Sequence, residues 1–441
     1  MTPKIQPGLT LNPRRWPESR FEVEKQSMSK DLLDRASSIP VPRASLAGTE
    51  RGASNERRLA AAGRPLKICI IGLKCYDHIS GSPTLRYLGG IETQLALLAK
   101  GLQREGCDVS LITYDHGQPE RQVFEGVTVI KGYSPTGGIR RIRWFFRLAK
   151  LWRAMKMADA DIYLQMGAGD ETGMVAGLCR RLSPAKPFVF CLAHDVDCYG
   201  LIWAGRFAAE TLIYRWGIKR ADLIVSQTRT QEKNLKTSMG FPSLIIQMAA
   251  KATEGSCGGS ACADQILWVG RIVPEKRPDW VLEMAKRCPG ITFHMAGSAN
   301  SSSEYAAKVL ADAKTIPNVR MHGSLGRAEL NKLFHSCSLL CCTSTTEGFP
   351  TTFLEVWSCG MPIVTTFDPD DVIKRHGLGR AVNSMDELIA EIQSLPRSES
   401  YEQMSNAARK YYLENQTVEA VARRFLRAFE DLMAGRKSAQ V

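Results

Sequence analysis

The sequence predicts an α/β protein built from two similar halves, each a doubly wound parallel sheet with helices on both faces. Apolar runs that suit buried strands alternate with helical segments from residue 66 onward, which is typical of parallel sheets. The alternation stops in a polar, glycine-rich segment, 251–264, and then restarts. The length of 441 residues agrees, because a chain of this size usually folds as more than one domain.

Six strands are expected in the first half, and helical segments separate most of them. The first strand ends in glycine, and a helix over 92–105 follows it with Gly89 and Gly90 at its start. The strands are predicted at 66–72, 108–113, 127–130, 161–165, 188–193 and 222–226.

The second half repeats the pattern, and its helices cover comparable lengths. Strands are predicted at 265–270, 291–296, 319–322, 339–342 and 361–364. Helices are predicted at 278–288, 302–314 and 327–336, and a further one begins at Pro350 and is capped by Gly360. Ligands of open α/β sheets bind at the carboxyl ends of strands, and the motifs described below all lie at such ends.

Five segments follow from this pattern: a disordered tail, a first domain, a linker, a second domain and a C-terminal helix with its own tail. They span 1–64, 65–250, 251–264, 265–420 and 421–441. The tail is rich in proline, serine, arginine and glutamate and lacks sustained periodicity, apart from a short helix allowed at 29–36.

The composition limits the class of protein. The formal net charge of +13 predicts an anionic partner, which is nucleic acid, an acidic membrane surface or a phosphorylated substrate. No apolar run reaches the roughly 18 to 20 residues of a membrane span, and residues 1–4 begin no apolar signal segment. Thirteen cysteines without a repeated C-x-x-C framework indicate reduced thiols. A cytoplasmic protein is therefore expected.

The stretch from Glu347 to Glu355 is the most informative one. A buried strand at 339–342 precedes it, and Pro350 suits the first turn of a helix because the N–H that it lacks would be unpaired there. Glu347 then lies just before a helix N-terminus, which attracts phosphate, while Glu355 lies inside the helix. Carboxylates accept hydrogen bonds from sugar hydroxyls, so the stretch predicts a pocket for a phosphorylated sugar.

Two further loops carry groups that suit an anion. Arg271 and Lys276 share the loop that begins at Gly270, and together they suit a diphosphate, although such a loop is often only solvated. Gly89 and Gly90 let backbone N–H groups approach an anion, although taken alone they fit a flexible turn better.

His194 directly follows a buried strand. It is placed to bond a sugar hydroxyl or a reacting oxygen, although a lone histidine at this position is more often structural. Asp195 and Asp197 spell D-x-D, a pattern that holds a divalent metal in some sugar transferases. The same pattern recurs at 159–161, as short patterns do by chance, and we expect no metal at 195–197.

A strongly basic segment spans 139–156 and has no acidic residue. Its arginines and lysines alternate with Trp144, Phe145, Phe146 and Trp152 at roughly helical spacing. A basic, aromatic helix of this kind suits the headgroup region of an anionic membrane. It equally suits a surface helix whose aromatic face packs on the sheet, and both interpretations stay open.

Together these motifs resemble those of the retaining glycosyltransferases of family 4, which have the GT-B fold. The stretch 347–355 is similar to that family's E-x7-E signature with its EGFP core, and 270–276 and Gly89-Gly90 match two further signatures in the family's order. The similarity is strongest over 264–381 and continues more weakly over 66–250. It implies two Rossmann-like domains facing a central cleft, the first on the acceptor side and the second binding the nucleotide sugar.

The resemblance implies a role for each matched residue. Arg271 and Lys276 would bind the donor diphosphate, and Gly89 and Gly90 would lie against its phosphates. No metal cofactor is then expected, because these cations and helix N-termini stabilise the departing diphosphate.

The remaining matched residues would surround the sugar and the nucleoside. Glu347 and His194 would face the transferred sugar near the reacting carbon, and Glu355 would bind the ribose. Backbone amides of Gly348 and Phe349 would contact sugar or phosphate.

Two positions are less closely matched. Ser344 is a weaker candidate for the pocket. The family usually has small residues at 356–358, where this chain has Val-Trp-Ser, and we expect that difference to affect packing.

The function implied is transfer of a sugar, of the hexosyl type, from a nucleotide diphosphate to a glycan or lipid-linked acceptor in polysaccharide or glycolipid synthesis. The enzyme would work in the cytoplasm or peripherally on the inner face of the membrane. Two alternatives stay open: a nucleotide-sugar epimerase with the same fold, and a non-catalytic protein that binds anions or membrane. Nucleic acid is not expected as a partner, because no nucleic-acid-binding signature accompanies the charge.

Overall fold

The computed structural model describes most of the chain beyond the predicted tail. It covers residues 64–81, 89–137, 143–182, 185–202, 208–253, 255–300, 302–345 and 347–438. The predicted tail, with its short helix at 29–36, lies outside these residues apart from Arg64.

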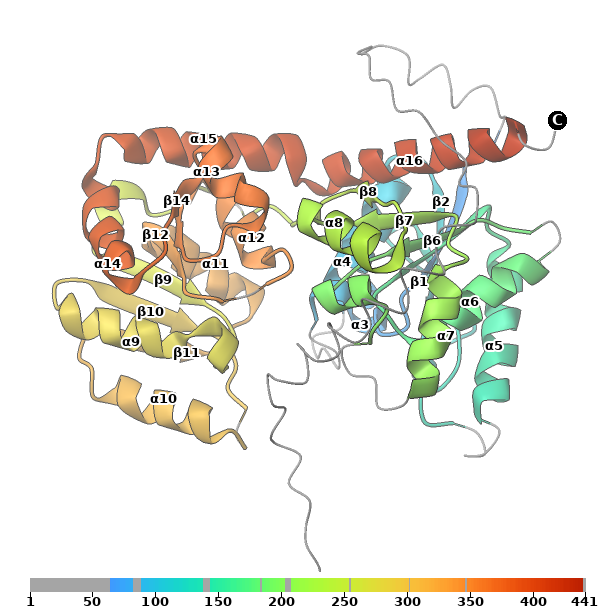
Figure 1. The fold of residues 1–441 in the computed structure, drawn as a ribbon, viewed down its shortest axis with the longest axis horizontal. Helices are drawn as coiled ribbons and strands as arrows, with labels where there is room; N and C mark the ends of the chain where they lie inside the picture. Colours follow the sequence, from blue (N-terminus) through green and yellow to red (C-terminus); the bar gives the residue numbers. More distant parts are fainter. Residues whose placement is uncertain are drawn as a thin grey trace, which may run out of the picture. The chain divides into compact units, whose positions relative to one another are not determined.

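The first sheet has eight strands in the order β3-β4-β2-β1-β5-β6-β7-β8. Figure 1 labels β1, β2, β6, β7 and β8 among them. All neighbouring strands run parallel except β3 and β4. The strands are β1 (Lys67–Ile71), β2 (Asp108–Thr113), β3 (Arg121–Phe124), β4 (Val127–Lys131), β5 (Ile162–Met166), β6 (Phe188–Cys191), β7 (Leu223–Ser226) and β8 (Leu244–Ile245). The six strands predicted for this half are confirmed, with small differences at their ends.

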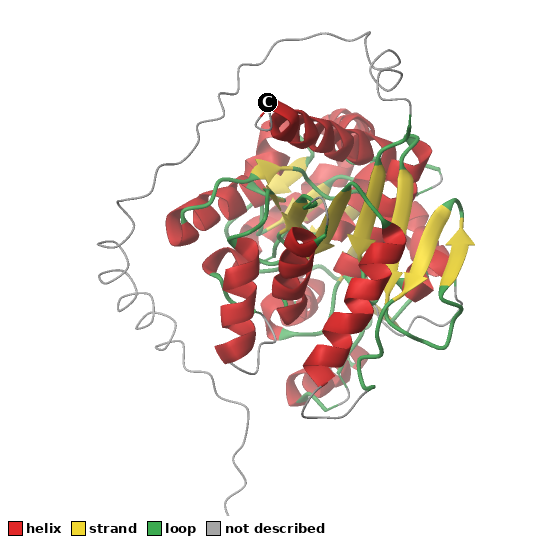
Figure 2. Ribbon diagram, turned by 90° about the vertical axis from the view of Figure 1, so that its right-hand side faces the viewer, coloured by secondary structure: helices red, strands yellow, loops and turns green. Residues whose placement is uncertain are grey.

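Helices cover both faces of this sheet, as predicted (Figure 2). Apolar side chains of α4 pack on one face, and those of α5, α6 and α7 pack on the other. The helices of this half are α3 (Tyr76–Ser80), α4 (Gly90–Arg104), α5 (Arg143–Ala158), α6 (Asp170–Arg181), α7 (Ala208–Ile218) and α8 (Arg229–Met239), with a 3₁₀ helix, η1 (Asp195–Tyr199).

The second sheet has six strands, all parallel, in the order β11-β10-β9-β12-β13-β14. They are β9 (Gln265–Val269), β10 (Thr292–Ala296), β11 (Val319–Gly323), β12 (Leu339–Cys342), β13 (Ile363–Thr365) and β14 (Gly379–Ala381). One face carries α9 (Pro278–Arg287), α10 (Glu304–Lys314) and α14 (Met385–Ser394). The other carries α11 (Arg327–Ser336), α12 (Thr351–Ser358), α13 (Val372–His376) and α15 (Ser400–Asn415).

The last helix, α16 (Val418–Ser438), returns to the first sheet and packs beside α4. A Cβ at Gly101 would lie 2.8 Å from Val418 Cγ1 and 2.9 Å from Ala422 Cβ, so the glycine lets the two helices approach closely. The predicted C-terminal helix therefore exists but begins at residue 418, before the expected 421.

Two local predictions, for Pro350 and for the strand at 361–364, need correction. Pro350 is the residue before α12 and not in its first turn, because its ψ of 116° is extended and not helical. The strand expected at 361–364 begins at Ile363, and the 3₁₀ helix η2 (Gly259–Cys262) interrupts the predicted linker. Gly360 does follow the helix in the left-handed conformation, φ 79°, which favours glycine.

Candidate functional site

The strand order of the second sheet reverses between β9 and β12, which are hydrogen-bonded neighbours. Ligands of open α/β sheets bind in the crevice at the carboxyl ends of strands beside such a reversal. The loop that follows β9 carries Arg271 and Lys276, and the loop that follows β12 carries Ser344 and Glu347. The fold therefore brings two predicted motifs to one point, although they are about seventy residues apart in the sequence.

Lys276 and Glu347 form an ion pair between these two loops, through Nζ and Oε1. Ser344 Oγ donates a hydrogen bond to the same Oε1 at 2.8 Å. The side chains of Lys276 and Glu347 are 21% and 16% exposed, so water screens their attraction only in part. Three predicted site residues thus make direct contacts.

Arg277, which the sequence analysis did not single out, ties the two loops together. Its Nε donates to the carbonyl of Thr343 at 2.6 Å, and its Nη2 donates to Thr366 Oγ1 at 2.7 Å. The guanidinium also lies 3.8 Å from the ring centroid of Trp280. Arg277 makes these contacts from the left-handed backbone region, φ 45°, which costs a residue with a side chain about 1 to 2 kcal/mol.

Thr343 strengthens the same junction. Its hydroxyl lies 2.6 Å from the carbonyl oxygen of Lys276 and accepts a bond from Trp268 Nε1 at 3.0 Å. The backbone that carries Lys276 is therefore held against the strand that leads to Glu347.

Arg271 is exposed, and its side chain has no hydrogen bond or ion pair to another described residue. It leaves β9 beside Gly270, whose backbone is in close contact with Gly297. The guanidinium is thus available to an anion.

His194 is exposed and immediately precedes η1. Its backbone N–H and that of Ala193 donate to the carboxylate of Asp197 at 3.0 and 2.9 Å. Burial raises the pKa of Asp197, and these two hydrogen bonds oppose that rise. Asp195 accepts a bond from Gln231 Nε2 at 3.1 Å, so both D-x-D carboxylates have partners within the protein.

Gly348 lies close to the segment that carries His194. A Cβ at this glycine would be 3.6 Å from the carbonyl oxygen of Ala193 and 3.9 Å from Gln231 Nε2. The loop after Glu347 therefore reaches the residue that precedes His194.

Glu355 forms an ion pair with Arg327 of α11, a residue that the sequence analysis did not identify. Arg327 also donates to the carbonyl of Lys251 at 3.0 Å. Burial raises the pKa of Glu355, and Arg327 opposes the rise. Within the described residues, Arg327 therefore bonds one of the two carboxylate oxygens, Oε1.

Phe349 places its side chain in the core, which leaves its backbone for the predicted contact. The ring is 4% exposed and meets Trp357 edge to face at a centroid distance of 6.3 Å. Trp357 is fully buried, so the departure at 356–358 affects packing, as expected.

Gly89 and Gly90 begin α4 on the first sheet, and Glu92 folds back over Gly89. Lys276, Ser344 and Glu347 contact one another at the second sheet, whereas the residues that follow these glycines, Ile91 and Glu92, line a cavity of the first sheet.

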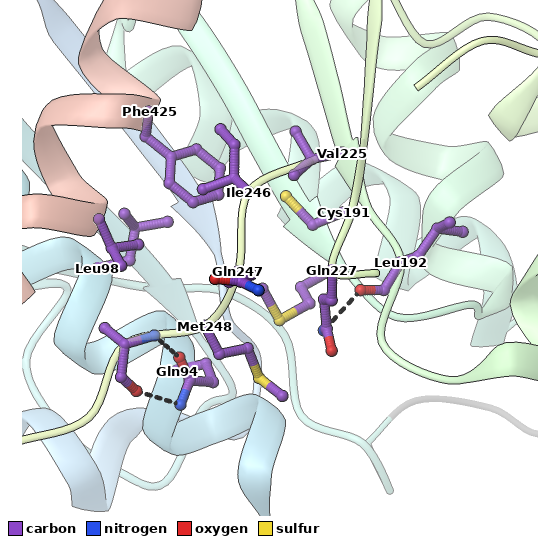
Figure 3. Close-up of a pocket in the computed structure, with 13 residues that line it drawn as sticks. Gln94, Leu98, Cys191, Leu192, Val225, Gln227, Ile246, Gln247, Met248 and Phe425 are labelled. Carbon is purple, nitrogen blue, oxygen red and sulfur yellow. Dashed lines mark hydrogen bonds between the residues drawn. The ribbon is translucent and has the colours of Figure 1, made fainter. Parts of the chain in front are cut away.

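A smaller cavity of about 20 Å³ is lined by none of the predicted site residues, and Figure 3 shows the residues that line it. There the side-chain amide of Gln94 on α4 donates to the carbonyl of Ala249 at 2.7 Å and accepts from its N–H at 2.9 Å. Tyr412 Oη bonds the next carbonyl, that of Ala250, at 2.8 Å. These bonds anchor the segment that connects the two sheets. The cavity itself is too small for a sugar.

The described part of the basic segment, α5, packs through Leu151, Ala154 and Met155. Trp144, Phe145 and Phe146 are instead 39%, 65% and 48% exposed. The aromatic side chains near the start of α5 therefore do not pack on the sheet. Among the described residues, no helix combines the length and the apolar character needed to span a bilayer.

Two family models match the chain in succession. Residues 89–246 match a model described as "Glycosyl transferase 4-like domain", and residues 263–411 match one described as "Glycosyl transferases group 1". Among curated proteins, the O-antigen biosynthesis glycosyltransferase WbnH of Escherichia coli is 24% identical over 74% of this chain and 93% of its own length. The D-inositol 3-phosphate glycosyltransferase of Mycobacterium marinum is 29% identical over 39% of this chain and 40% of its own.

Solved structures with the same arrangement of elements include two sugar-handling proteins. Sucrose-phosphate synthase of Thermosynechococcus elongatus aligns with a TM-score of 0.64 at 16% identity, over 84% of this chain and all of its own. HepE of Anabaena, solved with UDP and glucose, aligns with a TM-score of 0.61 at 13% identity, over 83% of this chain and all of its own.

Proposed function

We propose that this chain, which is a nucleotide-sugar glycosyltransferase with the GT-B fold, is a retaining enzyme of the family 4 type. The two family models and the named relatives establish the class of enzyme, and the solved structures establish the fold. The proposal adds the stereochemical outcome, the residues that act, and a glycan or lipid-linked acceptor in polysaccharide or glycolipid synthesis.

The contact between Lys276 and Glu347 at the strand reversal carries this proposal. A cation and a carboxylate at one point suit a ligand with a negative diphosphate next to a neutral sugar, because each group then binds the part it complements. Ser344 orients the carboxylate, and Arg271 adds a second cation that pairs with no described residue.

In the proposed reaction the anomeric C–O bond breaks and the diphosphate leaves with the electron pair. Arg271 and Lys276 stabilise the negative charge that develops on the leaving oxygen. The acceptor hydroxyl attacks from the face that the diphosphate leaves and passes its proton to that diphosphate, so the configuration is retained. Glu347 and His194 position the sugar, and neither is required as a general base.

Glu355 suits the ribose of the donor. Arg327 holds one carboxylate oxygen, and the other, which has no hydrogen bond to a described residue, suits a ribose hydroxyl. Gly89 and Gly90 at the start of α4 are proposed to approach the donor phosphates, and the amides of Gly348 and Phe349 the sugar or phosphate.

A divalent metal is not part of the proposed reaction. The charge of Arg271 and Lys276 takes over the role of a bound cation, and Asp197 already accepts two backbone hydrogen bonds. Sugar transfer is therefore expected to continue when a chelator is present.

We further propose that α5 attaches the enzyme to an anionic membrane. Its exposed aromatic side chains, Trp144, Phe145 and Phe146, lie among arginines and lysines with no acidic residue in the helix. Aromatic groups insert at the level of lipid headgroups, and each nearby cation contributes about 1 kcal/mol of attraction to an anionic surface.

A screen of nucleotide sugars for slow hydrolysis tests the proposed function without knowledge of the acceptor. We expect one donor to be hydrolysed by the wild type and not by Glu347→Ala, with the configuration of the released sugar read by NMR. An epimerase would instead yield a sugar that differs from the donor sugar at one stereocentre, either free or still attached to the nucleotide. Hydrolysis of no donor, or equal hydrolysis by both proteins, would contradict the proposal.

A further inference from the structure

A second and larger cavity, of about 190 Å³, lies in the first sheet. The strand order there reverses between β1 and β5. Residues 71–75 at the end of β1, Tyr114 after β2 and residues 165–169 at the end of β5 all line the cavity. It therefore occupies the position in this sheet that the donor residues occupy in the other.

Gln165 places an unused hydrogen-bond acceptor at the wall of this cavity. The residue is only 5% exposed, and its Nε2 donates to the carbonyl of Gly167 at 3.1 Å. Its Oε1 has no partner among the described residues. A buried amide oxygen without a partner is costly, so the site suits a ligand that donates a hydrogen bond.

Glu171 adds a carboxyl group to the same wall. Tyr133 Oη donates to its Oε1 at 3.3 Å, and the absence of a side chain at Gly169 leaves room for its Oε2. Burial, with a smaller contribution from the neighbouring Asp170, raises the pKa of Glu171 to about 7. The protonated carboxyl donates and accepts hydrogen bonds, and the ionised carboxylate accepts them.

The cavity lies near the proposed donor site, because residues of both lie close to Ala193. A Cβ at Gly167, which lines the cavity, would be 3.6 Å from Ala193 Cβ. A Cβ at Gly348, which follows Glu347, would be 3.6 Å from the carbonyl oxygen of the same residue. A group bound in the cavity thus lies beside the loop that the sugar is proposed to contact.

We infer that this cavity binds an uncharged, hydroxyl-bearing group of the acceptor, held by Gln165 and Glu171, and that it excludes a phosphate group there. That the bound group belongs to the acceptor rests on the proposed function. The preference of the cavity for an uncharged hydroxyl does not depend on it.

The hydrogen-bonding needs of the wall decide between a hydroxyl and a phosphate. A hydroxyl donates one bond and accepts others, so it satisfies both Gln165 Oε1 and Glu171. An ionised phosphate offers only acceptor oxygens and negative charge. Among the described residues that line the cavity, the charged ones are Glu92, Glu171 and the exposed Lys74, so carboxyl groups outnumber cations.

Saturation-transfer NMR on the full chain tests this inference with simple probes and without nucleotide. The probes are methyl hexopyranosides, which are uncharged, and glucose 6-phosphate. We expect the methyl glycosides to receive saturation from the wild type in the millimolar range and glucose 6-phosphate not to displace them. In Gln165→Leu and Glu171→Leu, which remove the hydrogen-bonding groups, the affinity for methyl glycosides should fall about tenfold. Glu120→Gln, an exposed carboxyl that pairs with Arg153, is the matched control and should bind like the wild type.

Stronger binding of glucose 6-phosphate, binding of no methyl glycoside by the wild type, or equal binding by all variants would overturn the inference. Donor binding is measured separately, by titration of UDP or GDP into the wild type and Lys276→Ala. If the wild type binds no nucleotide, or binds it no better than Lys276→Ala, the proposed function is contradicted while the glycoside result stands. The two failures are therefore distinguishable.

Discussion

Lys276 Nζ lies against Glu347 Oε1, so the cation proposed for the diphosphate is paired with the carboxylate proposed for the sugar. Ser344 donates to the same oxygen, which fixes the side of Glu347 that faces the cation. A bound diphosphate would compete with Glu347 for Lys276 and leave the carboxylate to the sugar. The two residues therefore act as one unit, and substitutions at either must be interpreted together.

Arg277 provides a test of how the two loops are held. Arg277→Gly and Arg277→Ala both remove its bonds to Thr343 and Thr366, but only glycine adopts φ 45° without cost. We expect the glycine variant to be about 1 kcal/mol more stable than the alanine variant in urea denaturation. Both should bind nucleotide more weakly than the wild type. Unchanged nucleotide affinity in both would show that Arg277 does not position Lys276.

We expect Glu355 to destabilise the fold at neutral pH and to strengthen the binding of nucleotide. Burial raises its pKa above the ordinary value of 4.5, so its contribution to stability is full at low pH and is lost as the pH rises through the folded pKa. At neutral pH, Glu355→Gln should therefore unfold at an equal or higher urea concentration than the wild type. Its nucleotide affinity should fall about tenfold, because a charged acceptor for the ribose is lost. A less stable variant with full affinity would contradict both roles.

His294 and His322 predict a pH dependence of stability that is separate from the site. Their rings stack, with His294 Nδ1 2.9 Å from His322 Nε2, and His294 Nε2 lies 2.8 Å from Gln265 Oε1. Burial lowers the pKa of both from the ordinary 6.5, and for His294 the charges of His322 and Arg320 add to it. Stability should be full above pH 6.5 and fall as the pH drops below it.

Urea midpoints measured across this pH range check the prediction, with His322→Gln as the comparison. This variant should lose part of the pH dependence. An identical pH dependence in the variant would assign the effect to other groups.

The membrane proposal is tested with vesicles that contain phosphatidylglycerol. Serine at both Phe145 and Phe146 should lower the partition coefficient at least about tenfold, because two exposed rings no longer insert. Leu413→Ser removes an equally exposed apolar side chain from α15 and serves as the control. Binding of the wild type should weaken in high salt, since salt screens the cations of α5. Sedimentation of the double variant like the wild type would exclude α5 as the attachment site.

Much of the fold was predictable because it depends on local patterns. The apolar runs of β1, β2 and β12 and the helix α11 lie at or very near the predicted residues. The short strand β3 was missed because two of its four residues are exposed and it pairs through a tight turn at Glu125 and Gly126. Strand β8, with two residues, carries no pattern at all.

A site contact was predictable where both residues belong to recognised motifs. It was not predictable where one of the two residues comes from another element that only the fold brings near. Lys276, Ser344 and Glu347 were all expected, and their contacts follow from the adjacency of β9 and β12. Arg327 was missed because it pairs with Glu355 from a different helix. Arg277 was missed because its left-handed backbone cannot be inferred from its neighbours in the sequence. Its position directly after Lys276 was the one available hint.

Calorimetric titration of UDP and GDP tests the central claim most directly. One of these nucleotides should bind the wild type, and Lys276→Ala should bind it about a hundredfold more weakly, because a positioned cation to the diphosphate is lost. Lys286→Ala, in which an exposed lysine of α9 is removed, should bind like the wild type. Glu347→Gln should retain or gain nucleotide affinity, since its carboxylate no longer competes for Lys276. Binding of neither nucleotide by the wild type, or equal binding by the wild type and Lys276→Ala, would contradict the account.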